Sequence, residues 1–188
     1  MKIILGSASE GRKKVMQELG LDFEIVPADI DEKAIRRDTP EELVLAVANA
    51  KADALVARIS EPALLITSDQ VILCEGELRE KPRDVAEARK FLQSYNSSPA
   101  HAVGAVTVTN SATGKRASGM QKSTIYFKPL PDDFTEDFIK SGKAFKYAGG
   151  FPVQDSTWTP YIERIEGGWD TAAGLSKELL ADLVKKVV

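Results

Sequence analysis

Near the start of the chain, a short apolar run leads into small hydroxyl residues and then to an arginine. Ile3 to Leu5 precede Gly6 to Ser9, and Arg12 lies in the first turn of the helix predicted to follow. A strand, a tight turn and a helix N-terminus in this order offer backbone N–H groups, hydroxyl groups and the positive end of a helix dipole to an anion. A guanidinium in the first turn would complete a phosphate site. The alternative is that Ser7 or Ser9 only caps the helix.

A carboxylate follows a second apolar strand. Ala63 to Thr67 predicts a buried strand, and the next residues, Ser68 to Gln70, are interpreted as a polar turn. Because ligands gather beyond the carboxyl ends of strands in open α/β sheets, parallel neighbours would bring Ser7 and Asp69 to one rim. The alternative is that Asp69 is a turn or cap residue.

Two cations lie on helix faces that the apolar pattern predicts to be buried. At about 100° per residue, Lys51 falls within the apolar arc of a helix over residues 40–58, and Arg12 is in phase with the apolar residues of the first helix. A buried lysine is costly unless it is paired, although it can also extend to solvent. One buried anion explains both cations better than two coincidences, so we expect an anion near Lys51 and Arg12.

Two further charged residues have both a functional and an ordinary interpretation. Glu32 ends the acidic run that begins at Asp29, and it is either a metal ligand or base facing Asp69, or part of a solvated loop. Lys81 precedes Pro82, which would stiffen the loop and hold the lysine in place. The alternative for Lys81 is an exposed loop residue.

The composition restricts the reactions that these residues can carry out. The only histidine, His101, falls on a predicted strand, so a metal site built from several histidines is excluded. The glycine-rich loops of Walker-type ATPases and Rossmann dehydrogenases are absent. Carboxylates with lysine and arginine fit phosphoryl chemistry, in which Mg²⁺ bridges carboxylates to phosphates and a carboxylate activates water.

Length and charge set the broad class of protein. The chain has 188 residues, of which 43% are hydrophobic, and a formal net charge of −3. We expect a single domain over residues 1–188, with no stable nucleic-acid partner and no membrane association. No apolar stretch is long enough to cross a bilayer and no signal peptide precedes the first strand, which predicts a cytoplasmic protein. The only cysteine, Cys74, is interpreted as a small core residue on a strand.

The elements that must position these residues alternate in the first half of the chain and become antiparallel in the middle. Thr39-Pro40 is a strong helix start, and Asp84 caps a third helix. Residues 101–109 and 116–128 predict a β-hairpin with one exposed face. The whole pattern predicts an α/β fold with a mixed sheet. Other strands are expected at residues 2–6, 23–26, 63–67 and 161–165, and helices at 9–19, 40–59, 85–95, 131–141 and 175–188.

Short motifs along nearly the whole chain resemble those of Maf-like proteins in type and in order. Each motif is weak alone, whereas the ordered set is specific. The motifs are Leu5-Gly6-Ser7-Ala8-Ser9, Leu19-Gly20-Leu21-Asp22-Phe23, Asp29-Ile30-Asp31-Glu32, Ala50-Lys51-Ala52, Thr67-Ser68-Asp69-Gln70, Lys81-Pro82 and Ala148-Gly149-Gly150-Phe151 through Gln154.

The resemblance implies a hydrolase of nucleotide metabolism. Members of this family are nucleoside triphosphate pyrophosphatases, which cut between the α- and β-phosphates to give a monophosphate and pyrophosphate, with Mg²⁺ or Mn²⁺ as cofactor. The implied fold is an elongated mixed β-sheet with flanking helices and two lobes around a cleft, as in the house-cleaning inosine triphosphatases. A homodimer is implied as well.

The resemblance also assigns residue roles, position by position. Asp69 would be the catalytic proton acceptor and, with Glu32, a ligand of the metal. The phosphates would be bound by Ser7, Arg12, Lys51 and Lys81. The positions linked to substrate choice would be Arg12, Gln70 and Gln154.

Two branches of the family differ in the nucleobase that they prefer. The chain resembles the branch that prefers 7-methylguanosine triphosphate in Ser68-Asp69-Gln70, Phe151 and Glu163-Arg164. Gln154, however, stands where that branch often has a glutamate, and an amide offers both a donor and an acceptor. A dTTP/UTP pyrophosphatase therefore stays open as the alternative.

The opening motif departs from the family pattern. Where relatives usually have Ser-Pro-Arg-Arg, this chain has Ser9-Glu10-Gly11-Arg12. The charge of Glu10 opposes a nearby phosphate, and Gly11 weakens the first turn by roughly 1 kcal/mol relative to alanine. We therefore expect weaker binding of phosphate.

Two other functions are considered: a nucleotide-binding regulator of cell division with little turnover, and a structural interaction domain.

Overall fold

The computed structural model describes all 188 residues and contains one mixed, seven-stranded sheet. Its strands are Lys2–Leu5 (β1), Glu24–Ile25 (β2), Ala63–Cys74 (β3), Glu77–Arg79 (β4), Ala100–Asn110 (β5), Arg116–Phe127 (β6) and Ile162–Glu166 (β7). The strand order is β2-β1-β3-β5-β6-β7, with β4 paired to β3 outside this path. β1 is parallel to β2 and β3, and the remaining pairs are antiparallel.

Six α-helices surround the sheet. They are Glu10–Glu18 (α1), Pro40–Val56 (α2), Val85–Ser94 (α3), Asp132–Lys140 (α4), Trp169–Ala172 (α5) and Lys177–Val187 (α6). Thr39 and Asp84 cap α2 and α3 as predicted, because their side chains accept from the backbone N–H groups of Glu42 and Glu87. The short α5 was not predicted, since one turn is too short to show an apolar period. None of the helices combines the length and the apolar character needed to span a membrane.

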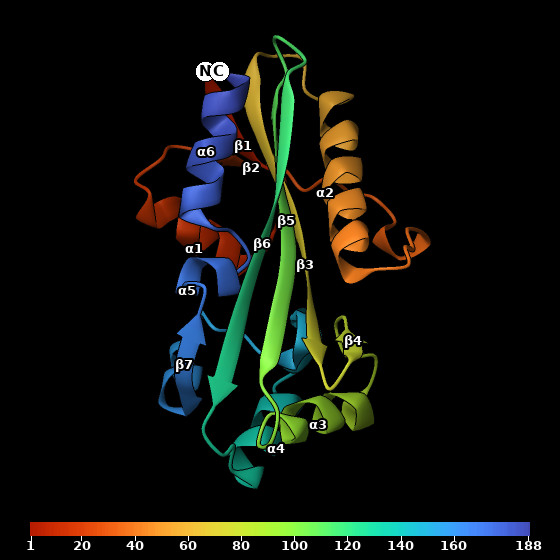
Figure 1. The fold of residues 1–188 in the computed structure, drawn as a ribbon, viewed down its shortest axis with the longest axis vertical. Helices are drawn as coiled ribbons and strands as arrows, with labels where there is room; N and C mark the ends of the chain where they lie inside the picture. Colours follow the sequence, from red (N-terminus) through yellow and green to blue (C-terminus); the bar gives the residue numbers. More distant parts are fainter.

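The molecule is elongated, and β3, β5 and β6 run along most of its length (Figure 1). α2 lies on one side of these strands and α1 and α6 lie on the other, while α3 and α4 lie toward the far end of the molecule. One lobe, with α1, α2 and α6, and a second lobe, with α3 and α4, thus share one sheet. This elongated mixed sheet with flanking helices confirms the expected fold class.

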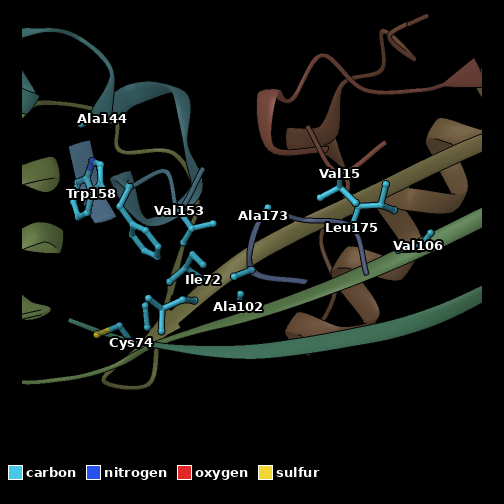
Figure 2. Close-up of a cluster of buried hydrophobic side chains, with 14 of the residues drawn as sticks. Val15, Ile72, Cys74, Ala102, Val106, Ala144, Val153, Trp158, Ala173 and Leu175 are labelled. Carbon is cyan, nitrogen blue, oxygen red and sulfur yellow. The ribbon is translucent and has the colours of Figure 1, made fainter. Parts of the chain in front are cut away.

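The apolar core forms one large cluster on one face of the sheet and two smaller clusters on the other. A cluster of 30 buried residues contains Ile72 and reaches from α1 and α6 to α3 and α4. Figure 2 shows part of it, with Val15 and Leu175 on one side and Trp158 on the other. A second cluster of 7 buried residues joins α2 to Val71. Because neighbouring strand residues point to opposite faces, Val71 and Ile72 show that α2 covers the face opposite the larger cluster.

The predicted polar turn at residues 68–70 is wrong, because β3 continues through Asp69 to Cys74. These polar residues stay in a strand because β5 pairs with β3 from Leu64 to Leu73. On the other side, β1 pairs only with residues 63–66 and β4 only with residues 72–74. Residues 67–71 therefore have no strand partner on that side. We call this stretch the β3 gap, and Asp69 lies at its centre.

The β5–β6 hairpin forms as predicted, but its expected exposed face is wrong for β5. Every residue of β5 after His101 is buried, because helices cover both faces of this central strand. The alternating pattern holds in β6, where Lys122 is exposed between buried Gln121 and Ser123. Cys74 is a buried strand residue with a free thiol, as predicted.

Candidate active site

The turn after β1 is held tightly against the sheet at Gly6. Its N–H donates to the carbonyl of Ile66 at 2.8 Å. A Cβ on Gly6 would lie 2.6 Å from Leu55 Cδ1 and 2.7 Å from Thr67 Cγ2, so a larger residue fits only if these side chains shift. This close approach places Ser7 beside the start of the β3 gap.

The serines of this turn do not cap α1. Ser9 occupies the N-cap position but makes no side-chain cap hydrogen bond. The Ser7 hydroxyl oxygen instead accepts from the Ser9 N–H at 3.2 Å and from Arg12 Nη1 at 3.0 Å. The first-turn N–H groups of α1 are therefore left to other partners, which favours the anion-site interpretation of the opening turn over the capping interpretation.

Arg12 is a buried cation that forms no ion pair with any carboxylate. Its side chain donates only to Ser7 Oγ and, from Nε, to the carbonyl of Gly174 at 3.3 Å. Burial lowers the pKa of the Arg12 guanidinium, and the charges of Asp69 and Glu32 oppose this change. A buried charge without a close counterion is costly, so the site favours an incoming anion.

Lys51 points inward from α2, as predicted, and only 6% of it is exposed. Its Nζ lies 3.0 Å from Asp69 Oδ1 and 3.1 Å from Glu32 Oε1. It also lies 3.4 Å from the carbonyl of Ser68. In the protein alone, the anions that Lys51 meets are thus carboxylates of the same chain.

Burial and neighbouring charges change the pKa of the Asp69 carboxyl group. Burial raises the pKa of Asp69 above its usual range, while the positive charges of Lys51 and Arg12 act in the opposite direction. These three residues come from β3, α2 and α1 and form one electrostatic group. A buried carboxylate with a raised pKa next to two cations is the kind of group that can serve as a proton acceptor.

Glu32 reaches this group from a short 3-10 turn, Glu32–Ala34, and its side chain is about half exposed. The carboxylates of Glu32 and Asp69 converge on the same Lys51 Nζ. Nowhere does the structure bring three His, Cys, Asp or Glu side chains together as a ready metal site. Two convergent carboxylates still fit Mg²⁺, because this ion commonly takes one or two protein carboxylates and completes its shell with substrate phosphates and water.

The residues linked to substrate choice are distributed around this group. Gln70 lies in the β3 gap, and its Nε2 donates to the carbonyl of Ala172 at 3.0 Å. Its buried Oε1 has no hydrogen-bond partner. Gln154 is half-buried in the other lobe, where its side chain is close enough to Tyr147 to lower the pKa of that hydroxyl. Burial has the larger and opposite effect on Tyr147.

Lys81 is not brought into the group around Asp69. It is exposed and forms no ion pair or hydrogen bond within the chain. Its loop lies against the Gly149–Gly150 turn, since the Glu80 carbonyl accepts from the Gly149 N–H at 3.0 Å. The structure thus groups Ser7, Arg12, Lys51, Asp69 and Glu32, with Gln70 beside them, and leaves Lys81 and Gln154 apart.

The departures in the opening motif have structural partners. Glu10 pairs with Lys13, whose Nζ lies 2.8 Å away. A Cβ on Gly11 would lie only 2.4 Å from the carbonyl oxygen of Ala173. The glycine is therefore needed for close packing of α1 against the segment after α5, and no side chain at Gly11 could enter the site from this position.

Sequence inspection missed the backbone groups of the site. The carbonyls of Ser68, Ala172 and Gly174 accept from Lys51, Gln70 and Arg12, respectively. Backbone carbonyls carry no residue-type signature, so no motif could have revealed them. The glycine at position 174 is the one residue type among them that indicates an unusual backbone, and its φ of +105° does favour glycine.

With this fold and site, the chain belongs to the Maf-like protein family, whose profile matches residues 2–187. It is 41% identical over 192 residues to a 7-methyl-GTP pyrophosphatase of Dictyostelium discoideum, with 98% of this chain and 96% of the relative covered. It is 31% identical over 185 residues to a dTTP/UTP pyrophosphatase of Geotalea uraniireducens (strain Rf4), with 98% and 94% covered.

The match confirms the resemblance drawn from the motifs. These relatives are named as nucleotide pyrophosphatases, which are hydrolases, in agreement with the predicted enzyme class. A crystal structure of a nucleoside-triphosphatase / dITP/XTP pyrophosphatase from Mycobacterium abscessus is 14% identical and has a TM-score of 0.44, with 98% of this chain and 94% of that chain covered. That likeness is too remote to bear on the site.

Proposed function

We propose that this chain hydrolyses the α–β phosphate bond of a nucleoside triphosphate to a monophosphate and pyrophosphate, with 7-methyl-GTP as the favoured substrate. The observation that carries the proposal is the buried group of Arg12, Lys51 and Asp69. It combines a cation that lacks a counterion with a carboxylate of raised pKa. Such a group can bind phosphate oxygens and activate water within one site.

In this proposal, Asp69 accepts the proton of the attacking water. Lys51 keeps the carboxylate ionised through its contact at 3.0 Å and turns toward phosphate oxygens when substrate arrives. Arg12, Ser7 and the uncapped N–H groups of α1 hold the phosphates from the other side. Lys81 lies apart from this group, and its exposed ammonium would contact only a part of the triphosphate that extends beyond the β3 gap.

A divalent cation is part of the proposal. Glu32 and Asp69 would hold it, because both carboxylates contact the Lys51 ammonium, lie close to each other and offer the oxygen donors that Mg²⁺ and Mn²⁺ accept. When bound, the cation neutralises phosphate charge. Removal of divalent cations with EDTA should abolish turnover, and Glu32→Gln should raise the Mg²⁺ concentration for half-maximal rate by about tenfold. Full activity in EDTA would contradict the metal proposal.

The preference for 7-methyl-GTP is supported by two observations on the sequence. Phe151 and Glu163-Arg164 match the corresponding branch of the family. The Dictyostelium relative named for this nucleotide is also more similar than the Geotalea relative named for dTTP and UTP, at 41% against 31% identity.

Asp69→Asn tests the proposal directly, because it preserves the shape of the side chain and removes the proton acceptor. We expect kcat to fall by about 10²- to 10⁴-fold, while the nucleotide still binds at saturating Mg²⁺ through Ser7, Arg12 and Lys51. Asp137→Asn is the matched control, since Asp137 is an exposed residue of α4 far from the site in sequence and contacts. Unchanged turnover in Asp69→Asn would refute the assigned base. Tight binding by the wild type without any turnover would favour the regulator instead.

A further inference from the structure

The short segment Trp169–Gly174 touches both sides of the candidate site. It comprises α5 and the two residues after it, and we call it the α5 segment. Its backbone accepts two hydrogen bonds from site residues. Gln70 Nε2 donates to the carbonyl of Ala172 at 3.0 Å, and Arg12 Nε donates to the carbonyl of Gly174 at 3.3 Å. Two long polar side chains from β3 and α1 are thus oriented by neighbouring carbonyls of one turn.

The same segment also reaches the loop that carries Gln154. Trp169 Nε1 donates to the carbonyl of Val153 at 3.4 Å, one residue before Gln154. Trp169 also contacts α1, because the Lys14 ammonium lies 5.1 Å from the centre of its ring. The half-buried indole therefore lies between α1 and the Gln154 loop and ties that loop to the α5 segment.

The α5 segment is itself fixed by close packing. Its Ala173 carbonyl leaves no room for a side chain at Gly11, and a Cβ on Gly174 would lie 3.1 Å from Arg12 Nε and 3.4 Å from Gln70 Oε1. Asp170 closes the following turn, because its Oδ2 accepts from the Lys177 N–H at 2.7 Å. Figure 2 shows Ala173 between Val153 on one side and Val15 on the other, where the two lobes meet.

We infer that the α5 segment is a shared positioning element for substrate choice. It sets the orientations of Arg12 and Gln70 through two carbonyls, and that of the Gln154 loop through the Trp169 indole. The inference rests on the proposed function, because only a nucleotide-binding site gives these three residues a nucleobase to select. Side chains held by hydrogen bonds to a rigid support present their polar groups in one geometry, and a shift of the support moves all of them together.

Trp169→Phe is the sharpest single test. It keeps an aromatic ring on the side chain beside Lys14 and removes the N–H that contacts Val153, together with part of the indole's volume. We expect the ratio of kcat/KM for 7-methyl-GTP to that for UTP to change by about tenfold. Tyr161→Phe is the matched control, since it removes the hydroxyl of another half-buried aromatic, which packs on Phe134 and makes no hydrogen bond to the α5 segment. A loss of folded protein lowers both rates equally and cannot move this ratio.

The path of the effect can be tested in a second background. If Trp169 acts through the Gln154 loop, Trp169→Phe should leave the ratio within about twofold in a Gln154→Ala protein. The same tenfold change in both backgrounds would contradict that path. Gly174→Ala should also change the ratio, because its Cβ would press on Arg12 and Gln70. If this variant does not fold, Trp169→Phe decides the question.

Failure of the inference can be separated from failure of the proposed function. The dissociation constants of 7-methyl-GTP and UTP, measured in the Asp69→Asn background, give a binding selectivity ratio that does not depend on turnover. A ratio that is unchanged in both Trp169→Phe and Gly174→Ala would overturn the role of the α5 segment while leaving a nucleotide pyrophosphatase intact. Binding selectivity that depends on Trp169, in a wild type that hydrolyses neither nucleotide, would overturn the hydrolytic function alone. Absence of binding to either nucleotide would overturn both.

Discussion

At the residue scale, the site depends on how charges are buried. Lys51 and Arg12 could be predicted to point inward because both lie in phase with apolar residues on their helices. Their partners could not be predicted, since Lys51 meets Asp69 and Glu32 whereas Arg12 meets only a hydroxyl and a carbonyl. Which counterions lie near a buried cation is decided by tertiary distances that a helical wheel does not contain.

The pairing of Lys51 with Asp69 predicts a change in the pH profile. Burial raises the pKa of Asp69 and Lys51 lowers it, and the base works only when it is ionised. The acidic limb of kcat/KM should therefore lie above the range of an ordinary aspartate, and Lys51→Met should move it to still higher pH. Rates of pyrophosphate release measured from acid to neutral pH check this, with Lys140→Met as a control from an exposed position of α4. An acidic limb that moves to lower pH in Lys51→Met would contradict the assignment.

At the element scale, most helices and strands could be predicted because their caps and apolar periods are strong. The end of β3 could not, since Ser68, Asp69 and Gln70 are polar residues that β5 keeps in a strand. Ser7 and Asp69 are thus close together as predicted, but the predicted reason, that β3 ends at Thr67, is wrong. Asp69 is reached because β1 ends early and leaves the β3 gap, rather than because β3 ends.

Gly11 gives a prediction that opposes simple helix propensity. Alanine is favoured over glycine by roughly 1 kcal/mol in a helix, but a Cβ here would lie 2.4 Å from the Ala173 carbonyl oxygen. Overpacking against backbone costs about 1–3 kcal/mol, so Gly11→Ala should lower the melting temperature. Gln17→Ala, at an exposed position of the same helix, is the control and should leave it nearly unchanged. A higher melting temperature in Gly11→Ala would contradict this prediction, because it would show that the α5 segment moves away from the added Cβ at little cost.

At the scale of the whole molecule, one sheet and one large apolar cluster connect the two lobes. The α/β class and the mixed sheet could be predicted from alternating elements and the hairpin pattern. The elongated shape came from the family resemblance, because no local pattern records how far β3, β5 and β6 extend together. The homodimer stays a prediction, which sedimentation of the purified chain would check.

The measurement that tests the central claim most directly is pyrophosphate release from 7-methyl-GTP, UTP and dTTP by the purified chain with Mg²⁺, side by side. We predict stoichiometric monophosphate and pyrophosphate, with the largest kcat/KM for 7-methyl-GTP. A larger value for UTP or dTTP would contradict the nucleobase preference. Release of inorganic phosphate and a diphosphate, or no hydrolysis of any nucleotide, would contradict the pyrophosphatase itself.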